Sequence, residues 1–309
     1  MDGKSPIRGR RLKGLGLAVT IAAVAIVTAL GLFVVMGVLH DKTIASDVAE
    51  LNEPVPDDAP GYLDVRVKMV ALDLNAETVG LKLECVPKGS YLVDEYGQLK
   101  RTLTLTVGES AAGMEKTKIL SPGAKGGVTT INLSLDGNVA DYSWDRHTTS
   151  LWLSAASSIK GKIYDPDVTP IRVQAYGAWP GLDIAFRAPA DIGDGERQLD
   201  VAVARSTVTT IVVCFSIVLV WTLIAIVAGM TCAVAIGGRR AEISSIAFFG
   251  MLLFAMTAFR NSLPGAPPMG TFSDYLAFFW GYAVAIIAIG VLAGVWLWRP
   301  PSKNEHAPR

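Results

Sequence analysis

Four long stretches without a charged residue constrain this chain more than any other feature of its sequence. About 20 helical residues cross the hydrocarbon core of a bilayer, which is about 30 Å thick, so an uncharged apolar run of about 18 or more residues predicts a transmembrane helix. The sequence therefore predicts an integral membrane protein with four transmembrane helices, in the runs 15–39, 206–236, 243–259 and 275–298.

The first run follows a basic segment, as does the apolar part of a cleaved signal peptide. In a signal peptide that part typically spans about 7–15 residues and precedes an Ala-x-Ala-like cleavage site. The run 15–39 has 25 residues, and no such site lies between it and His40. We therefore expect an uncleaved membrane anchor.

Lysine and arginine near the spans indicate the orientation, because cytoplasmic loops carry an excess of both. The loop 260–274 contains a single arginine, and residues 41–205 are acidic, with 24 acidic and 17 basic side chains. We therefore expect residues 40–205 to be extracytoplasmic and both termini to lie in the cytoplasm, with the plasma membrane as the location. Ten lysines and arginines lie in the three short segments assigned to the cytoplasm, 1–14, 237–242 and 299–309.

Between the first two spans, apolar residues alternate with polar ones. Leu63, Val65 and Val67 alternate with Asp64 and Arg66, and a period of two is typical of a half-buried β-strand. Gly, Pro, Asp and Asn turns separate such segments, which favours an antiparallel β-sandwich. The alternating segments lie at 63–69, 79–85, 103–107, 131–135, 151–153, 171–175, 182–186 and 199–203.

The predicted fold class is therefore α+β: a membrane protein with one transmembrane helix before, and three after, an extracytoplasmic antiparallel β-sandwich. Residues 40–60 hold three prolines and several acids, which is typical of an extended linker. The predicted order is a cytoplasmic basic tail (1–14), helix 1 (15–39), linker (40–60), β-sandwich (61–205), helix 2 (206–236), cytoplasmic turn (237–242), helix 3 (243–259), outer loop (260–274), helix 4 (275–298) and cytoplasmic tail (299–309).

No constellation of residues indicates catalysis, a cofactor or a metal site. The spans contain no Asp, Glu, Lys, Arg or His, although ion-coupled transporters usually carry such groups on the transport path. The three histidines lie in three different regions, and the nucleophile-elbow, phosphate-loop and His-Glu-x-x-His motifs are absent. Cys85, the one cysteine outside the spans, cannot form a disulfide within its domain. We expect a non-enzymatic protein without a nucleic-acid partner.

The most distinctive polar segment is 141–147, Asp-Tyr-Ser-Trp-Asp-Arg-His. One interpretation is a corner that faces a ligand or a partner. The other is a structural corner, in which both aromatic side chains are buried and hydrogen-bond to the backbone, while Asp145 pairs with Arg146 or caps a turn. The candidate residues of the segment are Tyr142, Trp144, Asp145 and Arg146.

The outer loop 260–274 is the second candidate site. Its three prolines and two glycines restrict the backbone and indicate a defined shape. One hypothesis is an ion pair between Arg260 and Asp274 across the base of the loop. In the alternative, Arg260 extends to the membrane surface, and Ser273 or Asp274 caps the last helix. The other candidate residues here are Pro264, Gly265, Pro267, Pro268 and Trp280.

Small residues recur four positions apart within the predicted spans. This spacing lets transmembrane helices approach closely, so it predicts packing of the four helices or of two copies of the chain. A homo-oligomer is therefore a candidate assembly within the lipid bilayer. The pairs are Gly229 and Ala233, Gly281 and Ala285, and Gly290 and Gly294.

The layout resembles an uncharacterised family of four-pass membrane proteins of mycobacteria and related actinobacteria. The resemblance covers nearly the whole chain but departs at Ser143, Trp144 and His147, because the family tends to read Tyr-Pro-Phe-Asp-x-Tyr where residues 142–147 stand. It implies a location in the bacterial envelope and supplies no activity. The second motif that carries it is Arg260-Asn261 with Leu263-Pro264-Gly265-Ala266-Pro267-Pro268-Met269-Gly270, Asp274 and Phe279-Trp280.

The sequence is compatible with two functions from different classes. The first is a non-enzymatic envelope protein whose external β-sandwich binds a protein or a cell-wall component; this rests on a sizeable domain without a catalytic set, and on analogy with other sandwich domains. The second is a lipid- or small-molecule-handling accessory subunit of a membrane transport assembly.

Overall fold

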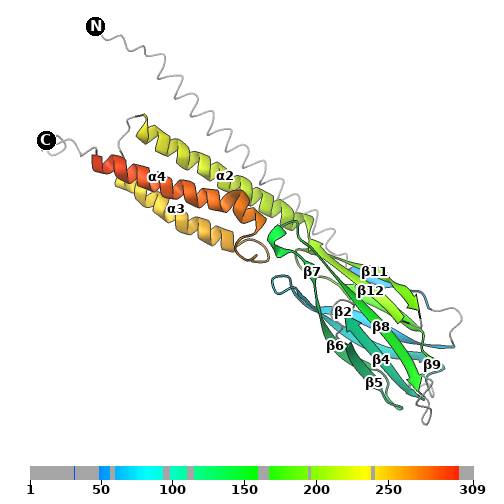
Figure 1. Ribbon diagram of the computed structural model, residues 1–309. Helices are drawn as coiled ribbons and strands as arrows, with labels where there is room; N and C mark the ends of the chain where they lie inside the picture. The colour runs from blue at the N-terminus through cyan, green and yellow to red at the C-terminus, as the bar shows by residue number, and fades with distance from the viewer. Residues whose placement is uncertain are drawn as a thin grey trace, which may run out of the picture. The chain divides into compact units, whose positions relative to one another are not determined.

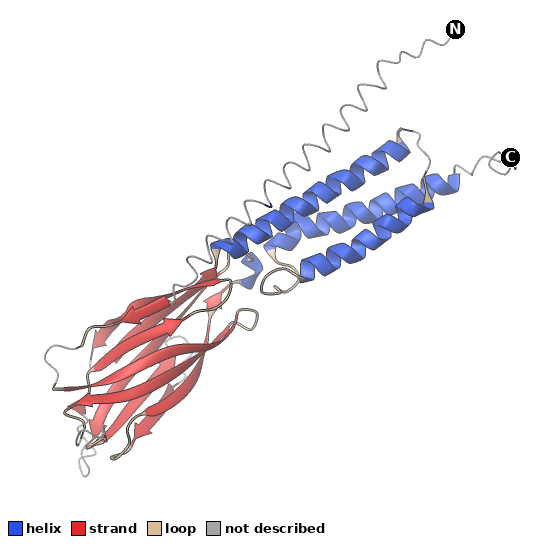
Figure 2. Ribbon diagram, turned by 180° about the vertical axis from the view of Figure 1, so that it is seen from behind, coloured by secondary structure: helices blue, strands red, loops and turns tan. Residues whose placement is uncertain are grey.

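A computed structural model describes residues 31, 49–55, 60–92, 98–109, 115–158, 167–193, 196–237 and 241–298. The chain divides into two compact units, of which Lys42–Ser206, here the β domain, contains all the described strands. The other unit includes residues Thr207–Arg309, which we call the helical unit and which contain the long described helices. Figure 2 distinguishes the strands in red from the helices in blue. The predicted first span, 15–39, lies outside the described residues except for Gly31.

Two sheets make up the β domain (Figure 1). The first has the order β1-β10-β2-β3-β6, and the second has the order β11-β12-β8-β4-β5, with β7 and β9 also paired to β8. The strands are β1 (Ala49–Asn52), β2 (Gly61–Asp73), β3 (Thr78–Gly89), β4 (Thr102–Glu109), β5 (Glu115–Leu120), β6 (Gly127–Ser134), β7 (Asp136–Gly137), β8 (Arg146–Ser158), β9 (Asp167–Val168), β10 (Ile171–Gly177), β11 (Leu182–Gly193) and β12 (Glu196–Arg205).

Alternation along the strands decides which side chains are buried. In β2, for example, Leu63 and Val65 are fully buried, whereas Arg66 is exposed. Buried residues from both sheets belong to a single hydrophobic cluster, and burial of this apolar surface is the main force that holds such a domain together. All eight segments predicted as strands overlap described strands, and the prediction of a large antiparallel β region is confirmed.

Two details of the β domain differ from the prediction. β10 pairs in parallel with β2, which is feasible because the long chain between them provides the crossover that parallel neighbours need. Residues 49–52, predicted as linker, form β1 and pair antiparallel with β10. The linker prediction is wrong for these residues, since a strand of four residues is too short to show alternation.

Three described helices are long and apolar enough to cross a membrane. They are α2 (Thr207–Ala235), α3 (Ile243–Asn261) and α4 (Phe279–Trp298), which continues the π-helical turn η2 (Asp274–Phe278). α4 packs along both α2 and α3. Phe249 of α3 is fully buried in a cluster with Val227 of α2 and Leu292 of α4.

One of the three predicted small-residue pairs contributes to this packing. Gly281 and Ala285 of α4 are buried, and a Cβ added to Gly281 would lie 2.2 Å from Cε of Met256 and 3.3 Å from Cγ1 of Val220. Gly281 therefore lets α4 approach α2 and α3 closely. By contrast, a Cβ added to Gly229, Gly290 or Gly294 would meet no atom within 4 Å.

Candidate functional site

The interior of the β domain becomes polar at one end of its second sheet. Along most of β4, β8 and β12 the inward side chains are aliphatic, but each series ends in a polar residue. The inward series are Leu103, Leu105, Val107 and Glu109 in β4; Leu151, Thr149 and His147 in β8, with Asp145 just before it; and Leu199, Val201, Val203 and Arg205 in β12.

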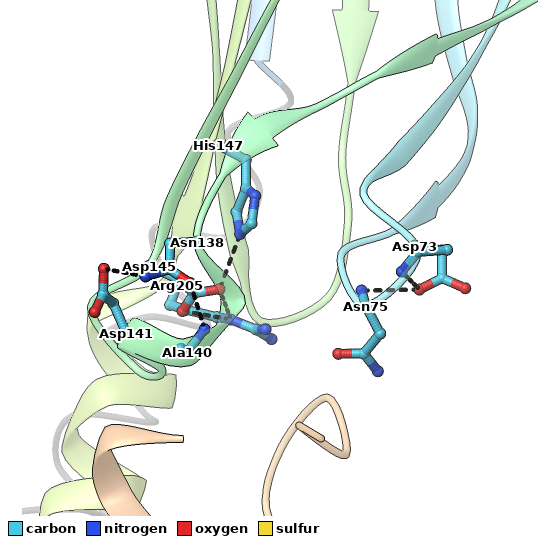
Figure 3. A network of polar contacts seen from close by, with 9 residues as sticks. Asp73, Asn75, Asn138, Ala140, Asp141, Asp145, His147 and Arg205 are labelled. Carbon is cyan, nitrogen blue, oxygen red and sulfur yellow. Dashed lines mark hydrogen bonds and ion pairs between the residues drawn. The ribbon is translucent and has the colours of Figure 1, made fainter. Parts of the chain in front are cut away.

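Asp145 lies between a histidine and an arginine at this polar end (Figure 3). Both of its carboxylate oxygens accept a hydrogen bond from Nε of Arg205 at 3.1 Å, and its Oδ2 is 3.2 Å from Nε2 of His147. The guanidinium of Arg205 also lies 4.9 Å from the centroid of the Tyr142 ring, a cation–π contact. The Arg205 side chain is 5% exposed, and those of Asp145 and His147 are fully buried.

This cluster holds the corner of residues 139–147 against the last strand of the domain. A histidine beside a carboxylate can serve as a general base, but a fully buried pair is closed to a substrate. Among the described residues, Nη2 of Arg205 and Nδ1 of His147 are buried without a hydrogen-bond partner. The geometry supports the structural interpretation of the corner.

Two details of the structural interpretation are wrong. Trp144 is 48% exposed, although it was expected to be buried with Tyr142. Of the two roles expected for Asp145, pairing with Arg146 or capping a turn, the first is wrong, because Arg146 is exposed and the described partners of Asp145 are Arg205 and His147. Successive side chains in a strand point to opposite faces, so Asp145 and His147 point inward while Arg146 points outward.

The outer loop of the helical unit is built around a second buried arginine. Arg260 donates from Nε to Oδ1 of Asp274 at 2.9 Å and from Nη2 to Oδ2 at 2.7 Å. It also donates to the carbonyl oxygens of Pro267, at 2.9 Å, and Pro268. The ion pair between Arg260 and Asp274, which was one of two hypotheses, is therefore present. The alternative, in which Arg260 extends to the membrane surface, is wrong, because its side chain is 8% exposed.

Asp274 fixes the rest of the loop by accepting hydrogen bonds from the chain before it. Its Oδ2 accepts from the backbone N–H of Gly270 at 2.8 Å and of Thr271 at 3.2 Å. Gly265, with φ of 77°, follows Pro264 in a turn closed by a hydrogen bond from Ala266 N–H to the Leu263 carbonyl; Pro-Gly in the centre of a turn favours this geometry. The prolines and glycines thus give the loop a defined shape.

The predicted site residues divide between the two units. Tyr142, Trp144, Asp145 and Arg146 belong to the β domain, and Arg260, Pro264, Gly265, Pro267, Pro268, Asp274 and Trp280 belong to the helical unit. Trp280 is 58% exposed on α4 and takes no part in the described loop network. Sequence reasoning missed Arg205, although its position just before a span was a signal for an anchoring charge.

A third feature, centred on Trp152, was also missed. Trp152 occupies an outward position of β8, the central strand of the second sheet, opposite Gly108 of β4 and Gln198 of β12. A Cβ on Gly108 would lie 2.3 Å from Cε2 and Nε1 of the indole, so the ring packs directly over this glycine. Trp152 remains partly exposed.

Polar but mostly uncharged side chains surround the indole. Asp200 of β12 accepts a hydrogen bond from Oγ of Ser150 at 2.7 Å and from Nε2 of Gln198 at 2.9 Å. The outward positions of β4, of β8 from Thr148 onward and of β12 from Gln198 onward contain no lysine or arginine. We call this surface the Trp152 face. The sequence did not mark Trp152 as a candidate residue, because a single aromatic residue in an alternating strand has no distinguishing pattern.

Neither unit offers a recognisable metal or thiol centre in the part of the chain that the structure describes. No three His, Cys, Asp or Glu side chains there come together as metal ligands. Cys85 is buried in the hydrophobic cluster, and burial raises the pKa of its thiol to about 12. A thiol in such surroundings is a poor nucleophile at neutral pH.

The fold defines an α+β protein with a large antiparallel β region and three helices apolar enough to cross a membrane. Residues 53–204 match a family model described as Domain of unknown function (DUF4436), and residues 205–299 match one described as Domain of unknown function (DUF8686). No curated protein matches the chain. The chain is thus similar to two uncharacterised domain families, whose border coincides within two residues with that between the β domain and the helical unit.

Proposed function

We propose that this chain is a membrane-anchored binding protein of the cell envelope, whose external β domain recognises a neutral glycan of the cell wall. The Trp152 face carries this proposal. The polarised C–H bonds on one side of a sugar ring are attracted to the negative face of an aromatic ring. The adjacent hydroxyl, carboxylate and amide groups of Ser150, Asp200 and Gln198 supply hydrogen-bond partners for sugar hydroxyls.

The composition of the face favours a neutral ligand over an anionic one. Anionic polymers are normally bound by lysine and arginine, which the outward positions of the Trp152 face lack; the exposed Arg187 of the adjacent strand β11 lies opposite Asp200. The packing of the indole over Gly108 fixes the orientation of the ring before a ligand binds. Such preorganisation lowers the entropic cost of binding.

The proposal includes the topology that the sequence predicts. In it, residues 15–39 form a first transmembrane helix, the two sheets form a β-sandwich outside the cell, and both termini are cytoplasmic. The distribution of lysine and arginine supports this orientation, and the shared hydrophobic cluster supports the sandwich. The resemblance to four-pass actinobacterial proteins supports the envelope location.

Glycan binding is testable with the full-length protein in mild detergent. Co-sedimentation with insoluble peptidoglycan and with purified neutral cell-wall polysaccharide should retain the wild type. Replacement of Trp152 by Ala should weaken retention by about tenfold or more, since truncation of a central aromatic anchor typically costs about 2 kcal/mol or more. Trp144→Ala is the matched control, because Trp144 is exposed outside this face. Equal retention of both variants, or no retention of the wild type, would reject glycan recognition.

A second candidate function is handling of a lipid or another apolar molecule as an accessory subunit of a transport assembly. It is favoured by one observation, an apolar groove of about 360 Å³ between α2 and α3. Identification by mass spectrometry of lipids and proteins that co-purify from native membranes separates the two functions. A stoichiometric lipid without glycan binding would support the second.

A further inference from the structure

The groove between α2 and α3 offers an occupant apolar contacts only. It is lined by Leu219, Leu223 and Ile226 of α2 and by Leu252, Ala255 and Phe259 of α3, among others, and none of the lining residues is charged. The one hydroxyl in its wall, that of Thr222, donates to the carbonyl oxygen of Val218 at 2.8 Å. Since this bond uses the single O–H of Thr222, the wall has no free donor side chain for a polar ligand.

The arrangement of the three helices corresponds to three corners of a four-helix bundle. α4 packs along both α2 and α3 and so occupies the corner between them. In a four-helix bundle each helix has two neighbours, and the position diagonal to α4 is the one beside both α2 and α3. The groove lies at that position.

We propose that residues 15–39 form the fourth helix of this bundle and dock in the groove between α2 and α3. The inference rests on the four-span topology of the proposed function. The run is long enough, since 25 helical residues at about 1.5 Å each extend about 37 Å, which exceeds the bilayer core of about 30 Å. It contains no charged residue, which matches the wall of the groove.

One side of the run is suited to close contact. Ala18, Ala22, Ala25 and Ala29 stand four, three and four positions apart, so a helix presents them on one face. Small residues on one face let transmembrane helices approach closely, and packing contacts then hold them together. The run is thereby complementary to the larger leucine and phenylalanine side chains of the groove.

The connection to the β domain favours this occupant over a second copy of the chain or a lipid. Nine residues, 40–48, separate the run from β1, and they reach at most about 30 Å when extended. Only Ser206 separates β12 from α2. Two segments tethered to one domain in this way meet at a high effective concentration.

Disulfide cross-linking in native membranes tests the docking. Cys214 and Cys232 are first replaced by Ala, while Cys85 is retained because it is buried. A cysteine scan of residues 18–29 is then combined with Ala255→Cys, which lines the groove. Phe254→Cys is the matched control, because Phe254 is the adjacent residue, is 81% exposed and does not line the groove.

If the helix docks, we expect cross-links within one chain that recur every three or four positions of the scan. These cross-links should be several-fold more frequent with Ala255→Cys than with Phe254→Cys. A cross-link within one chain is identified when the two cysteines no longer react with a maleimide reagent and no band of a covalent dimer appears on a gel. Cross-links between two chains would overturn the proposal in favour of a second copy. Equal yields with both partners would overturn it in favour of a lipid-filled groove.

A separate readout distinguishes failed docking from a failed topology. If residues 15–39 cross the membrane without docking, Ala22→Cys resists a water-soluble maleimide but forms no preferred cross-link. If they do not cross the membrane, Ala22→Cys reacts with the reagent in intact membranes, and the four-span topology itself is rejected. Glycan binding by the Trp152 face is measured independently of either result.

Discussion

Among the described residues, each unit contains a buried arginine–aspartate pair, and the two pairs differ in how completely their polar atoms are matched. In the helical unit, Nε, Nη1 and Nη2 of Arg260 all donate to Asp274 or to proline carbonyls. In the β domain, Arg205 donates to Asp145 through Nε, but its Nη2 is buried without a partner among the described residues. Its guanidinium contacts the Tyr142 ring instead.

The difference reflects the surroundings of each pair. The Arg260 pair closes a loop of irregular backbone, whose carbonyl and N–H groups are available as partners. The Arg205 pair lies where two strands already use their backbone groups in sheet hydrogen bonds, so the arginine must rely on side chains. Removing one partner from a buried pair leaves an uncompensated charge, and the loss should be larger where more hydrogen bonds depend on it.

The largest effect is expected from Asp274→Ala, which leaves the Arg260 charge buried and the loop without its central acceptor. We expect a loss of about 5 kcal/mol in stability, seen as a lower thermal transition of the full-length protein in detergent. The control is Arg260→Met combined with Asp274→Leu, which removes both charges and should cost less than the single change. A double variant as unstable as Asp274→Ala would show that the loop needs the hydrogen bonds more than charge compensation.

Asp145→Ala should have a smaller but still large effect on the β domain. We expect a loss of about 3 kcal/mol, because Arg205 keeps its contact with the Tyr142 ring while its charge loses the carboxylate. Unfolding followed by tryptophan fluorescence of the full-length protein measures this loss. Arg146→Ala, at the exposed neighbouring position, should change stability by no more than about 0.5 kcal/mol. Similar values for both variants would contradict the anchoring role of Asp145.

Two glycine substitutions compare packing in the two units. Gly108→Ala places a Cβ 2.3 Å from the rigid Trp152 indole and should destabilise the β domain by about 1–3 kcal/mol. Gly281→Ala meets the flexible end of Met256 and should cost less, since Ala also favours the helix by about 1 kcal/mol. Thermal unfolding of both variants measures the difference. A larger loss of stability for Gly281→Ala would mean that α3 and α4 cannot shift to make room for the added Cβ.

The smallest effect is expected from a partly exposed ion pair of the first sheet. Nζ of Lys82 donates to Oε1 of Glu84 at 2.7 Å, and this hydrogen bond lowers the pKa of Glu84. A carboxylate with a lowered folded pKa contributes stability above its unfolded value, about 4.3, and loses it as the pH falls through the folded value. The melting temperatures of wild type and Glu84→Gln should therefore differ slightly at neutral pH and converge in acid. A gap that persists at a pH well below both the folded and the unfolded pKa of Glu84 would rule out this linkage.

Much of the fold was predictable because its signals are local. Uncharged runs revealed α2, α3 and α4 to within about two residues at most ends, and alternation revealed eight strands. β7 and β9, with two residues each, are too short to carry a pattern. β5 alternates poorly because it lies at an edge of its sheet, where few of its side chains are buried.

The candidate sites were predictable to different degrees for the same reason. Arg260 and Asp274 are 14 positions apart across one loop, so their pairing could be proposed from the sequence. Arg205 and Asp145 are 60 positions apart, and only the register of β8 with β12 brings them together. The Trp152 face likewise exists only once three strands are aligned.

The burial of Cys85 has a consequence for the proposed location of the β domain outside the cell. Burial raises the pKa of this thiol to about 12, so the thiol is almost entirely protonated at neutral pH, and the thiolate is the species that reacts with oxidants and disulfides. An unpaired, accessible cysteine in an oxidising compartment ordinarily forms mixed disulfides and covalent aggregates. In the proposed location, burial in the hydrophobic cluster should slow these reactions and keep the Cys85 thiol reduced while the domain stays folded.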